Sequence, residues 1–463
     1  DSRNADYLGQ ALDVLFLGTG SVSPTRHRSS PSLALRLPEA VWLFDCGENT
    51  QIQYQRAKLT SKGLRKVFIT HLHGDHIFGL PGLLSHMNVA KGDRFRAKPT
   101  ESGQSYRAAE ENTVEIYGPS GLRSYLRSVE LFTGASFCPY IVHELKDVPN
   151  FSHKRRTSGA LEEFVPVWSE NSPASQTLGK NEVRQGDDIC ANSDGIWEIV
   201  QTGECSVKAA ALHHTVPTVG YVVQEHDRPG RIDPSLVTPA IDRNWDALVN
   251  LGFKNPMIML SELKKMKRHQ SYTFPDGEKV LARDILTEDH PGRKFAFFGD
   301  CSDASDSMKA IAMDCDILVH EATNSGINKY ERENTINEQC GLSEFIRRRG
   351  HSNPAMAGAM AKAVRARALY LNHFSHRYPT FSPWLPPHLK KNYQEFEKSV
   401  KAAAAQQCHL TSADVHLAHD LQEVIVPAHS HSPVSTEEKR KKRRARKQLW
   451  REERQRAASS RKE

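Results

Sequence analysis

Residues 71–76 read His-Leu-His-Gly-Asp-His and place three imidazoles and one carboxylate within six positions. They directly follow the run 66–70, whose β-branched and aromatic side chains predict a strand. In an extended backbone, side chains two residues apart point to the same side, so His71 and His73 can bind one metal ion. Imidazole together with carboxylate suits zinc better than calcium or magnesium, which prefer shells made of oxygen alone.

The second half of the motif can serve a second ion. Gly74 allows the backbone to turn sharply, after which Asp75 and His76 face a second position. The alternative interpretation is a histidine-rich surface loop that binds metal only adventitiously. Because the motif follows a hydrophobic strand, we favour a built metal site and hence a metal-dependent hydrolase.

Four further hydrophobic runs also end on residues that can bind metal or exchange protons. They are 207–212 before His213 and His214, 295–299 before Asp300, 316–319 before His320 and Glu321, and 369–372 before His373. In a layered α/β protein, strand ends at one edge of a sheet converge, and ligands are commonly bound there. We therefore expect these side chains to meet the motif at 71–76.

The first ion needs one more ligand besides His71 and His73. A third neutral imidazole would leave one coordination position for water, which is the usual arrangement of a catalytic zinc site. Either His214 or His213 can supply it.

The second ion can be bound by Asp75, His76 and His373, with Asp300 available as the carboxylate that bridges both ions. Two zinc ions about 3.5–4 Å apart can share a hydroxide placed for in-line attack on a phosphodiester. Metal coordination lowers the pKa of the bound water toward about 7, so this nucleophile exists at neutral pH.

The composition is that of a protein with a large core and no membrane span. The 463 residues are 38% hydrophobic and 25% charged, and no apolar run approaches the roughly 20 residues needed to cross a bilayer. The eight cysteines form no Cys-x-x-Cys pair, which is typical of a reducing compartment rather than of a disulfide scaffold. We expect Cys301 and Cys315 to be packing residues.

Predicted strands and helices alternate from the start of the chain, which indicates a layered α/β domain. Strands are expected over 12–17, 32–37, 41–45 and 66–70, and helices over 50–58 and from about 77 to 84. Residues 90–113 and 146–204 are rich in polar residues and have weak periodicity. We expect surface insertions there.

Longer motifs surround these residues between residue 12 and about residue 378. They are FLGTGS (16–21), WLFDCGENTQ (42–51), ITHLHGDHIFGLPGLL (69–84), EIYGPSGLR (115–123), HTVPTVGY (214–221), GDCSD (299–303), HEAT (320–323), GHSNP (350–354) and NHFSHRY (372–378). In these motifs the sequence resembles a known family, ribonuclease Z, the tRNA 3′-processing endonuclease of the metallo-β-lactamase fold, and in particular its short eukaryotic form.

The resemblance implies a four-layer αββα metallo-β-lactamase fold for residues 1–436. It also implies an inserted tRNA-binding arm within about 225–285, followed at the end of the chain by the basic tail 437–463. The family's arm has a Gly-Pro-rich tip, whereas segments 225–231 and 255–265 of this chain lack the Gly-Pro pair. We therefore expect an arm here, but the resemblance does not define its tRNA contacts.

The resemblance also selects among the candidate ligands, because it places His214 rather than His213 at the ligand position. It assigns His71, His73 and His214 to one zinc ion and Asp75, His76 and His373 to the other, with Asp300 bridging. In the family, the aspartate at the position of Asp75 also orients or deprotonates the attacking water. The cofactors implied are two Zn²⁺ ions, for which Mn²⁺ or Mg²⁺ can substitute.

The resemblance further implies that Glu321 and His351 protonate the departing 3′ oxygen. A carboxylate beside an imidazole raises its basicity and fixes its tautomer. The alternative for Glu321 is a salt-bridged core carboxylate, but the Gly-His-Ser motif downstream favours catalysis. The family usually has threonine where this chain has Asn353, a difference that bears on how His351 is held.

The implied function is a zinc-dependent endoribonuclease that removes the 3′ trailer from precursor tRNA after the discriminator nucleotide. One rival is another dinuclear zinc hydrolase of the same fold, such as a phosphodiesterase, thioesterase or lactonase. A second is a noncatalytic RNA-binding protein, disfavoured because every predicted ligand is present. Family members of this length are commonly homodimers. We expect the nucleus or cytoplasm, with a mitochondrion or plastid as the alternative, because the chain begins at Asp1 and an upstream targeting peptide would not be visible.

The basic charge of the chain is concentrated in residues 437–463. This segment contains 13 Lys and Arg against 5 Asp and Glu, a net charge of +8, whereas the whole chain carries +7. The segment is either a solvated, disordered extension or a site of nucleic-acid contact or nuclear import. Our hypothesis is that it attracts tRNA phosphates without regard to base sequence.

Deletion of residues 437–463 should weaken RNA binding mainly at low salt, because phosphate contacts release counterions whose effect fades as salt rises. Binding of precursor tRNA measured over a series of salt concentrations tests this. An unchanged affinity with an unchanged salt dependence would contradict the hypothesis.

Overall fold

The computed structural model describes residues 12–38, 40–61, 63–91, 113–151, 177–227, 230, 232–267, 269–287, 291–331, 341–381 and 386–426. They form two compact units: one comprises the described residues up to His226 and from Arg293 onward, and the other lies within Asp227–Gly292. The predicted tail 437–463 and the parts 92–112 and 152–176 of the predicted insertions lie outside the described residues. None of the helices described has the length and apolar character needed to cross a membrane.

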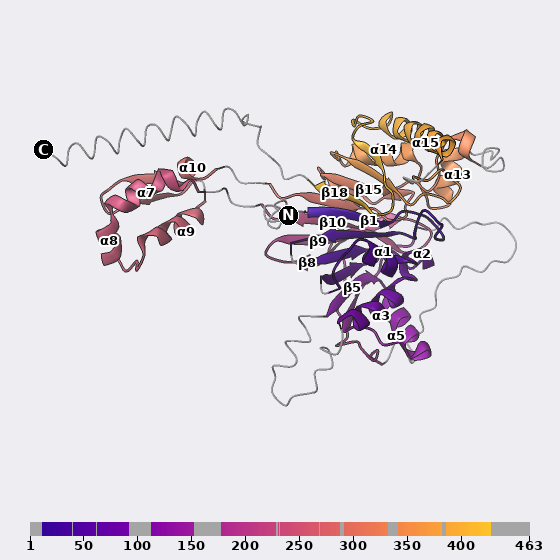
Figure 1. The fold of residues 1–463 in the computed structure, drawn as a ribbon, viewed down its shortest axis with the longest axis horizontal. Coiled ribbons are helices and arrows are strands. Elements are labelled where there is room, and N and C mark those ends of the chain that lie inside the picture. Colours follow the sequence, from indigo (N-terminus) through magenta and orange to yellow (C-terminus); the bar gives the residue numbers. More distant parts are fainter. Residues whose placement is uncertain are drawn as a thin grey trace. The chain divides into compact units, whose positions relative to one another are not determined.

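The first sheet of the larger unit contains the strand that leads to the His71–His76 motif (Figure 1). Its strand order is β18 (Gln422–Val426), β1 (Leu12–Gly18), β2 (Ser32–Arg36), β3 (Val41–Phe44), β4 (Leu64–Phe68), β5 (Val114–Pro119), β6 (Tyr140–Leu145) and β7 (Asp188–Ile189). Strands β3 to β7 pair in parallel. Their carboxyl ends therefore lie at one edge.

The second sheet contains the four other strands at whose ends predicted site residues lie. Its order is β14 (Asp303–Ala304), β9 (Cys205–His213), β10 (Thr218–Glu225), β13 (Lys294–Phe297), β15 (Ile317–Glu321), β16 (Leu369–Asn372) and β17 (Val415–Leu417), with β8 (Ile196–Gln201) paired to β9. Strands β13, β15, β16 and β17 are parallel. Strand β9 runs in the same direction as β13, because both are antiparallel to β10.

The two sheets pack face to face through aromatic side chains. The ring of Phe44 in β3 lies 6.0 Å from that of Tyr221, 5.6 Å from that of Phe295 and 5.5 Å from that of Phe297, all centroid to centroid and all in the second sheet. Burial of such large rings is a major source of stability. This contact fixes the two sheets against each other.

Helices cover both outer faces, as Figure 1 shows. On the first sheet these are α1 (Thr50–Arg56), α3 (Leu80–Lys91) and α5 (Leu122–Thr133), and on the second they are α11 (Asp306–Ala312), α14 (Pro354–Ala363) and α15 (Pro387–Ala405). The layers are thus helix, sheet, sheet, helix. The four-layer αββα fold expected from the sequence is confirmed.

The region 146–204, expected to be a surface insertion, contributes strands β7 and β8 to the two sheets. Trp197 of β8 is 2% exposed and belongs to the core between the sheets. The strands are short and follow a long polar stretch, so their periodicity gave little signal in the sequence.

The smaller unit has a hydrophobic core of its own, centred on Val237, Ile241, Leu248 and Phe274. Its elements are α7 (Pro234–Arg243), α8 (Trp245–Asn250), the 3₁₀ helix η2 (Pro256–Ile258), α9 (Met259–Lys264), β11 (Ser271–Thr273), β12 (Lys279–Leu281) and α10 (Ala282–Ile285). The unit is inserted between the antiparallel strands β10 and β13. The predicted arm, 225–285, falls almost entirely on it.

Gly79 lies where the chain passes from α2 (Gly74–Ile77) to α3, and a Cβ atom there would be 1.9 Å from the carbonyl oxygen of Gly47. We expect Gly79→Ala to lower the free energy of unfolding by about 1–3 kcal/mol, because the contact is with backbone and cannot be relieved by a side-chain rotation. Gly82→Ala in α3 is the matched control, since its nearest neighbour, Gln51, is 3.4 Å away. Urea denaturation of both variants measures the difference; a Gly79→Ala midpoint at or above that of wild type would refute the expectation.

Candidate active site

The His71–His76 motif lies at the carboxyl end of β4, as the sequence predicted. His73 is the N-cap of the short helix α2, and Asp75 and His76 belong to that helix. His71 and His76 are buried. The extended backbone before Gly74 and the helical turn after it separate the motif into two pairs of side chains.

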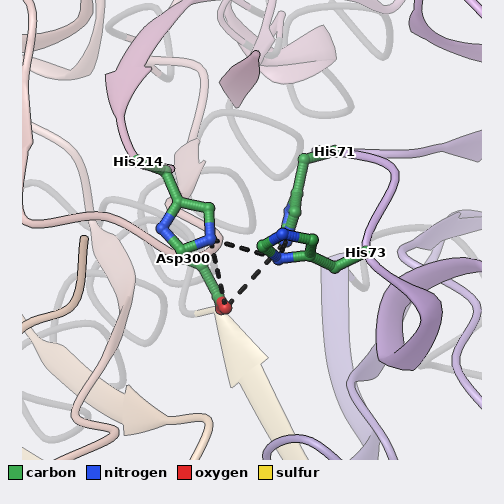
Figure 2. Close-up of side chains that lie close together, drawn as sticks. All are labelled: His71, His73, His214 and Asp300. Carbon is green, nitrogen blue, oxygen red and sulfur yellow. Dashed lines mark hydrogen bonds and ion pairs between the residues drawn. The ribbon is translucent and has the colours of Figure 1, made fainter. Parts of the chain in front are cut away.

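The first group of side chains contains His71, His73, His214 and Asp300 (Figure 2). His73 Nδ1 lies 3.0 Å from His71 Nε2 and 3.3 Å from His214 Nε2. Asp300 Oδ2 lies 4.0 Å from His71 Nε2 and 3.9 Å from His214 Nε2. Ligands about 2.0–2.1 Å from a tetrahedral zinc ion are separated by roughly 3.3 Å, so this group has the dimensions of a zinc site.

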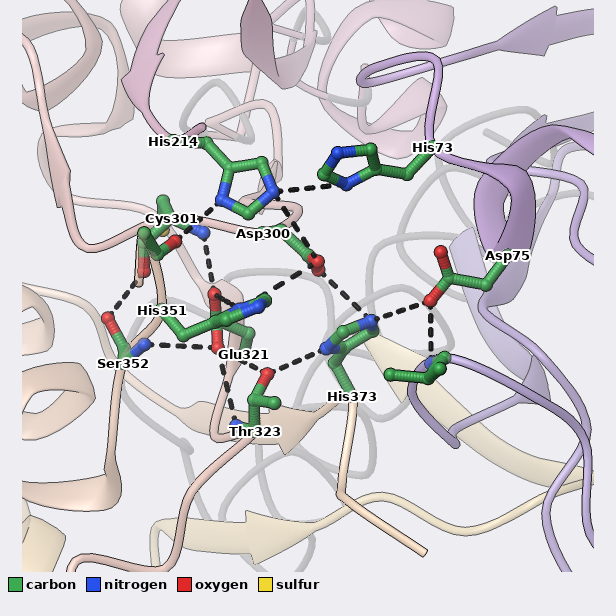
Figure 3. A network of polar contacts seen from close by, with 12 residues as sticks. His73, Asp75, His214, Asp300, Cys301, Glu321, Thr323, His351, Ser352 and His373 are labelled. Carbon is green, nitrogen blue, oxygen red and sulfur yellow. Dashed lines mark hydrogen bonds and ion pairs between the residues drawn. The ribbon is translucent and has the colours of Figure 1, made fainter. Parts of the chain in front are cut away.

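The second group contains Asp75, His76 and His373, again with Asp300. Figure 3 shows His373 directed toward Asp75 and Asp300. His373 Nε2 lies 3.4 Å from Asp75 Oδ2 and 3.2 Å from Asp300 Oδ1. His76 Nε2 lies 3.7 Å from Asp75 Oδ2 and 3.4 Å from Asp300 Oδ1. These four atoms also have the spacing of a tetrahedral ligand set.

Asp300 lies between the two groups and points one carboxylate oxygen into each. Its Oδ1 atom and the Nε2 atom of His76 are buried and have no hydrogen-bond partner among the described residues. A buried polar atom without a partner is costly. Two cations would supply partners to both atoms, so the residues present fit a dinuclear metal centre.

Asp45 orients two of the candidate ligands, His76 directly and His71 through the Thr70 hydroxyl. Its Oδ2 atom accepts a hydrogen bond from His76 Nδ1 at 2.7 Å, and its carboxylate accepts one from the Thr70 hydroxyl at 3.0 Å. That hydroxyl lies 2.9 Å from His71 Nδ1. Asp45 was not among the predicted site residues, although it also follows a hydrophobic strand, β3, and that signal could have revealed it.

The other two strand-end imidazoles are held in a similar way. His214 Nδ1 donates to the carbonyl oxygen of Gly350 at 2.6 Å, and His373 Nδ1 lies 2.7 Å from the Thr323 hydroxyl. When Nδ1 of a neutral imidazole donates a hydrogen bond, Nε2 carries no proton and its lone pair faces the site.

Burial controls the protonation of the first group. It lowers the pKa of His71 and His73, and it lowers that of His214 to about 4 although the carboxylate of Asp300 opposes the shift. These three imidazoles are therefore neutral near pH 7, which is the form that binds a metal ion.

Glu321 and His351 lie in contact beside the first group. His351 Nδ1 is 3.0 Å from Glu321 Oε1 and 3.8 Å from Asp300 Oδ2. Burial lowers the pKa of His351, but Glu321 and the other carboxylates nearby outweigh this and raise it to about 9. His351 is thus protonated at neutral pH and part of its ring is accessible.

Two residues that the sequence singled out lie apart from these groups. The His213 ring stacks on Phe151 at 3.9 Å and belongs to neither group. Asn353 is the N-cap of α14, where its Oδ1 atom accepts a hydrogen bond from the backbone N–H of Met356 at 3.0 Å. Asparagine therefore performs the capping role that threonine could also perform, directly after the His351 loop.

Comparison with known proteins shows which proteins this chain is similar to. The family model of Anti-Pycsar protein Apyc1 matches residues 12–99. Zinc phosphodiesterase ELAC protein 1 of Homo sapiens is 33% identical over 370 residues, which cover 80% of this chain and 87% of that protein. Ribonuclease Z of Acaryochloris marina is 32% identical over 372 residues, covering 79% of this chain and 87% of that protein. The crystal structure of human tRNase Z, short form (ELAC1), is 25% identical, covers 90% of this chain and all of its own chain, and has a TM-score of 0.50.

The αββα sandwich with a cluster of histidine and aspartate side chains at one edge defines a hydrolase of the metallo-β-lactamase fold. Within that class, the chain belongs to the ribonuclease Z family. The family recognised from the sequence motifs is therefore confirmed, and with it the prediction of an endoribonuclease.

His214 and His213 are adjacent, yet only His214 lies in a ligand group, which permits a direct test. We expect His214→Ala to weaken zinc binding by more than the roughly 10–100-fold that loss of an outer hydrogen-bond partner costs. His213→Ala should bind zinc as wild type does. Metal content after dialysis distinguishes the two variants, and equal zinc loss in both would contradict the assignment.

Proposed function

We propose that the protein removes the 3′ trailer from precursor tRNA by hydrolysis after the discriminator nucleotide. The products are a tRNA with a 3′-hydroxyl and a trailer with a 5′-phosphate. The observation that supports this most is the position of His351, a proton donor 3.8 Å from the bridging carboxylate of Asp300. An alkoxide leaving group such as a ribose 3′ oxygen needs such a donor.

Two ions are proposed to bind between the seven side chains described above, with Asp300 shared by both. The proposed ligands are His71, His73 and His214 for one ion and Asp75, His76 and His373 for the other. When bound, two zinc ions lower the pKa of water and neutralise charge on a phosphodiester, and Mn²⁺ or Mg²⁺ are proposed substitutes.

Asp75 is proposed to orient the attacking water and accept its proton. Burial raises the pKa of Asp75, but the hydrogen bond and charge of His373 and the charge of His76 outweigh burial, and the net effect lowers this pKa. The carboxylate is therefore ionised and accepts hydrogen bonds. Its Oδ2 atom accepts one from the backbone N–H of Val22 at 2.7 Å. The group is therefore fixed in place beside the ions.

His351 is proposed to complete the reaction. The water oxygen forms a bond to phosphorus, the bond from phosphorus to the 3′ oxygen breaks with its electron pair on that oxygen, and His351 transfers a proton to it. Glu321, which is fully buried and contacts His351 Nδ1, stabilises the protonated imidazole until that transfer.

The unit within Asp227–Gly292 is proposed to grip the RNA. It exposes Lys264, Lys265 and Lys267 at the end of α9 and just beyond it. Lys265 is paired with Glu262, which leaves the other two lysines as the better candidates for phosphate contact. A homodimer, and location in the nucleus, the cytoplasm or an organelle, stay predictions.

Cleavage of a 3′-extended precursor tRNA with zinc or manganese supplied tests the mechanism. Asp75→Ala should reduce the rate by about 10²–10⁴-fold, the usual contribution of a general base, toward both precursor tRNA and the small diester bis(p-nitrophenyl) phosphate. Equal activity of wild type and Asp75→Ala, or no cleavage by wild type, would reject it.

The same assay separates an RNA substrate from a small one. Replacement of Lys264 and Lys267 by glutamate should weaken cleavage of precursor tRNA and leave that of the small diester unchanged, because the small diester has no further phosphates for these lysines to contact. Lys398→Glu, at an exposed position of α15, is the matched control for a change of surface charge. Wild-type cleavage of the small diester without cleavage of RNA would favour the small-molecule phosphodiesterase instead.

A further inference from the structure

Glu321 accepts more hydrogen bonds than a role with His351 alone would require (Figure 3). Its Oε1 atom accepts from His351 Nδ1 at 3.0 Å and from the backbone N–H of Cys301 at 2.7 Å. Its Oε2 atom accepts from the backbone N–H of Ser352 at 3.1 Å and from the hydroxyl of Thr323. Each oxygen thus serves a different group of partners.

The Thr323 hydroxyl connects Glu321 to the candidate ligand His373. An ionised carboxylate can only accept, so the hydroxyl proton is directed to Glu321 and the hydroxyl oxygen accepts from His373 Nδ1 at 2.7 Å. A neutral imidazole has one N–H. Nε2 of His373 then carries the lone pair, and this atom lies 3.4 Å from Asp75 Oδ2 and 3.2 Å from Asp300 Oδ1.

The other half of the site is built in the same way. The Thr70 hydroxyl lies 3.0 Å from Asp45 and 2.9 Å from His71 Nδ1. The backbone N–H of Thr70 also donates to Asp45 at 2.8 Å. Asp45 contacts His76 directly, as Glu321 contacts His351. Each half therefore has one buried carboxylate, one hydroxyl between that carboxylate and an imidazole, and one imidazole bound directly.

We propose that Thr323 and Thr70 are positioning residues that set the tautomers of His373 and His71, one for each metal position. Through Thr323, Glu321 serves both the proton donor His351 and the second metal position. This inference rests on the proposed function, because it assumes that metal ions bind at these ligands.

The test measures zinc affinity rather than activity, by competition with a chelator. Thr323→Val keeps the branched shape and removes the hydroxyl. It should weaken the binding of one of the two zinc ions by about 10–100-fold. Thr323→Ser should restore the affinity. Thr70→Val is the matched variant in the other half of the site, and it should weaken the binding of the other ion.

Combination with a ligand variant shows which ion is affected. In a His373→Ala background, Thr323→Val should cause no further loss, because its effect passes through that imidazole, whereas Thr70→Val should weaken the ion that remains. Full additivity of Thr323→Val with His373→Ala would overturn the inference. If Thr323→Val does not fold, as judged by circular dichroism, Thr323→Ala takes its place in the same comparison.

Wild-type protein separates failure of this inference from failure of the proposed function. If wild type does not bind two zinc ions, the proposed metal chemistry is wrong. If it does, and Thr323→Val binds both with wild-type affinity, the proposed role of Thr323 is wrong while the proposed function stands.

Discussion

The compensation of buried negative charge is the constraint on which the site depends. Asp45, Asp300 and Glu321 are each at most 2% exposed, and all lie at one edge of the sandwich. Burying ionised carboxylates is costly unless they are paired and hydrogen-bonded. Imidazoles, backbone N–H groups and threonine hydroxyls supply part of that compensation. Asp300 Oδ1 and His76 Nε2, which have no hydrogen-bond partner among the described residues, mark where cations would supply the remainder.

The same constraint links the site to the fold, because neither sheet contains a complete ligand set. His71, His73, Asp75 and His76 follow a strand of the first sheet, whereas His214, Asp300 and His373 follow strands of the second. The aromatic contacts around Phe44 hold the two sheets, and with them these strand ends, against each other. Ions bound by ligands from both sheets would connect the sheets and so contribute to folding stability.

Local signals predicted a layered α/β fold and the residues at the strand ends, whereas the four-layer arrangement, the choice of His214 and the inclusion of His351 came from the resemblance to the family. Hydrophobic runs ending on His71, Asp300 or His373 mark strands and ligands in one pattern. Thr70 and Thr323 left no such signal, since a hydroxyl beside a ligand acquires its role only from three-dimensional hydrogen bonds. Strand β8 was missed for a related reason: its short pattern becomes a strand through pairing with β9.

Asp45 and His373 share a left-handed backbone conformation, each with φ of +58°. Non-glycine residues rarely adopt it, and holding one there costs of order 1–3 kcal/mol. A chain selected for stability alone would have glycine or asparagine at both positions. The protein instead has a carboxylate and an imidazole there, so the two turns that position these side chains lower the stability of the fold in exchange for a defined orientation at the site.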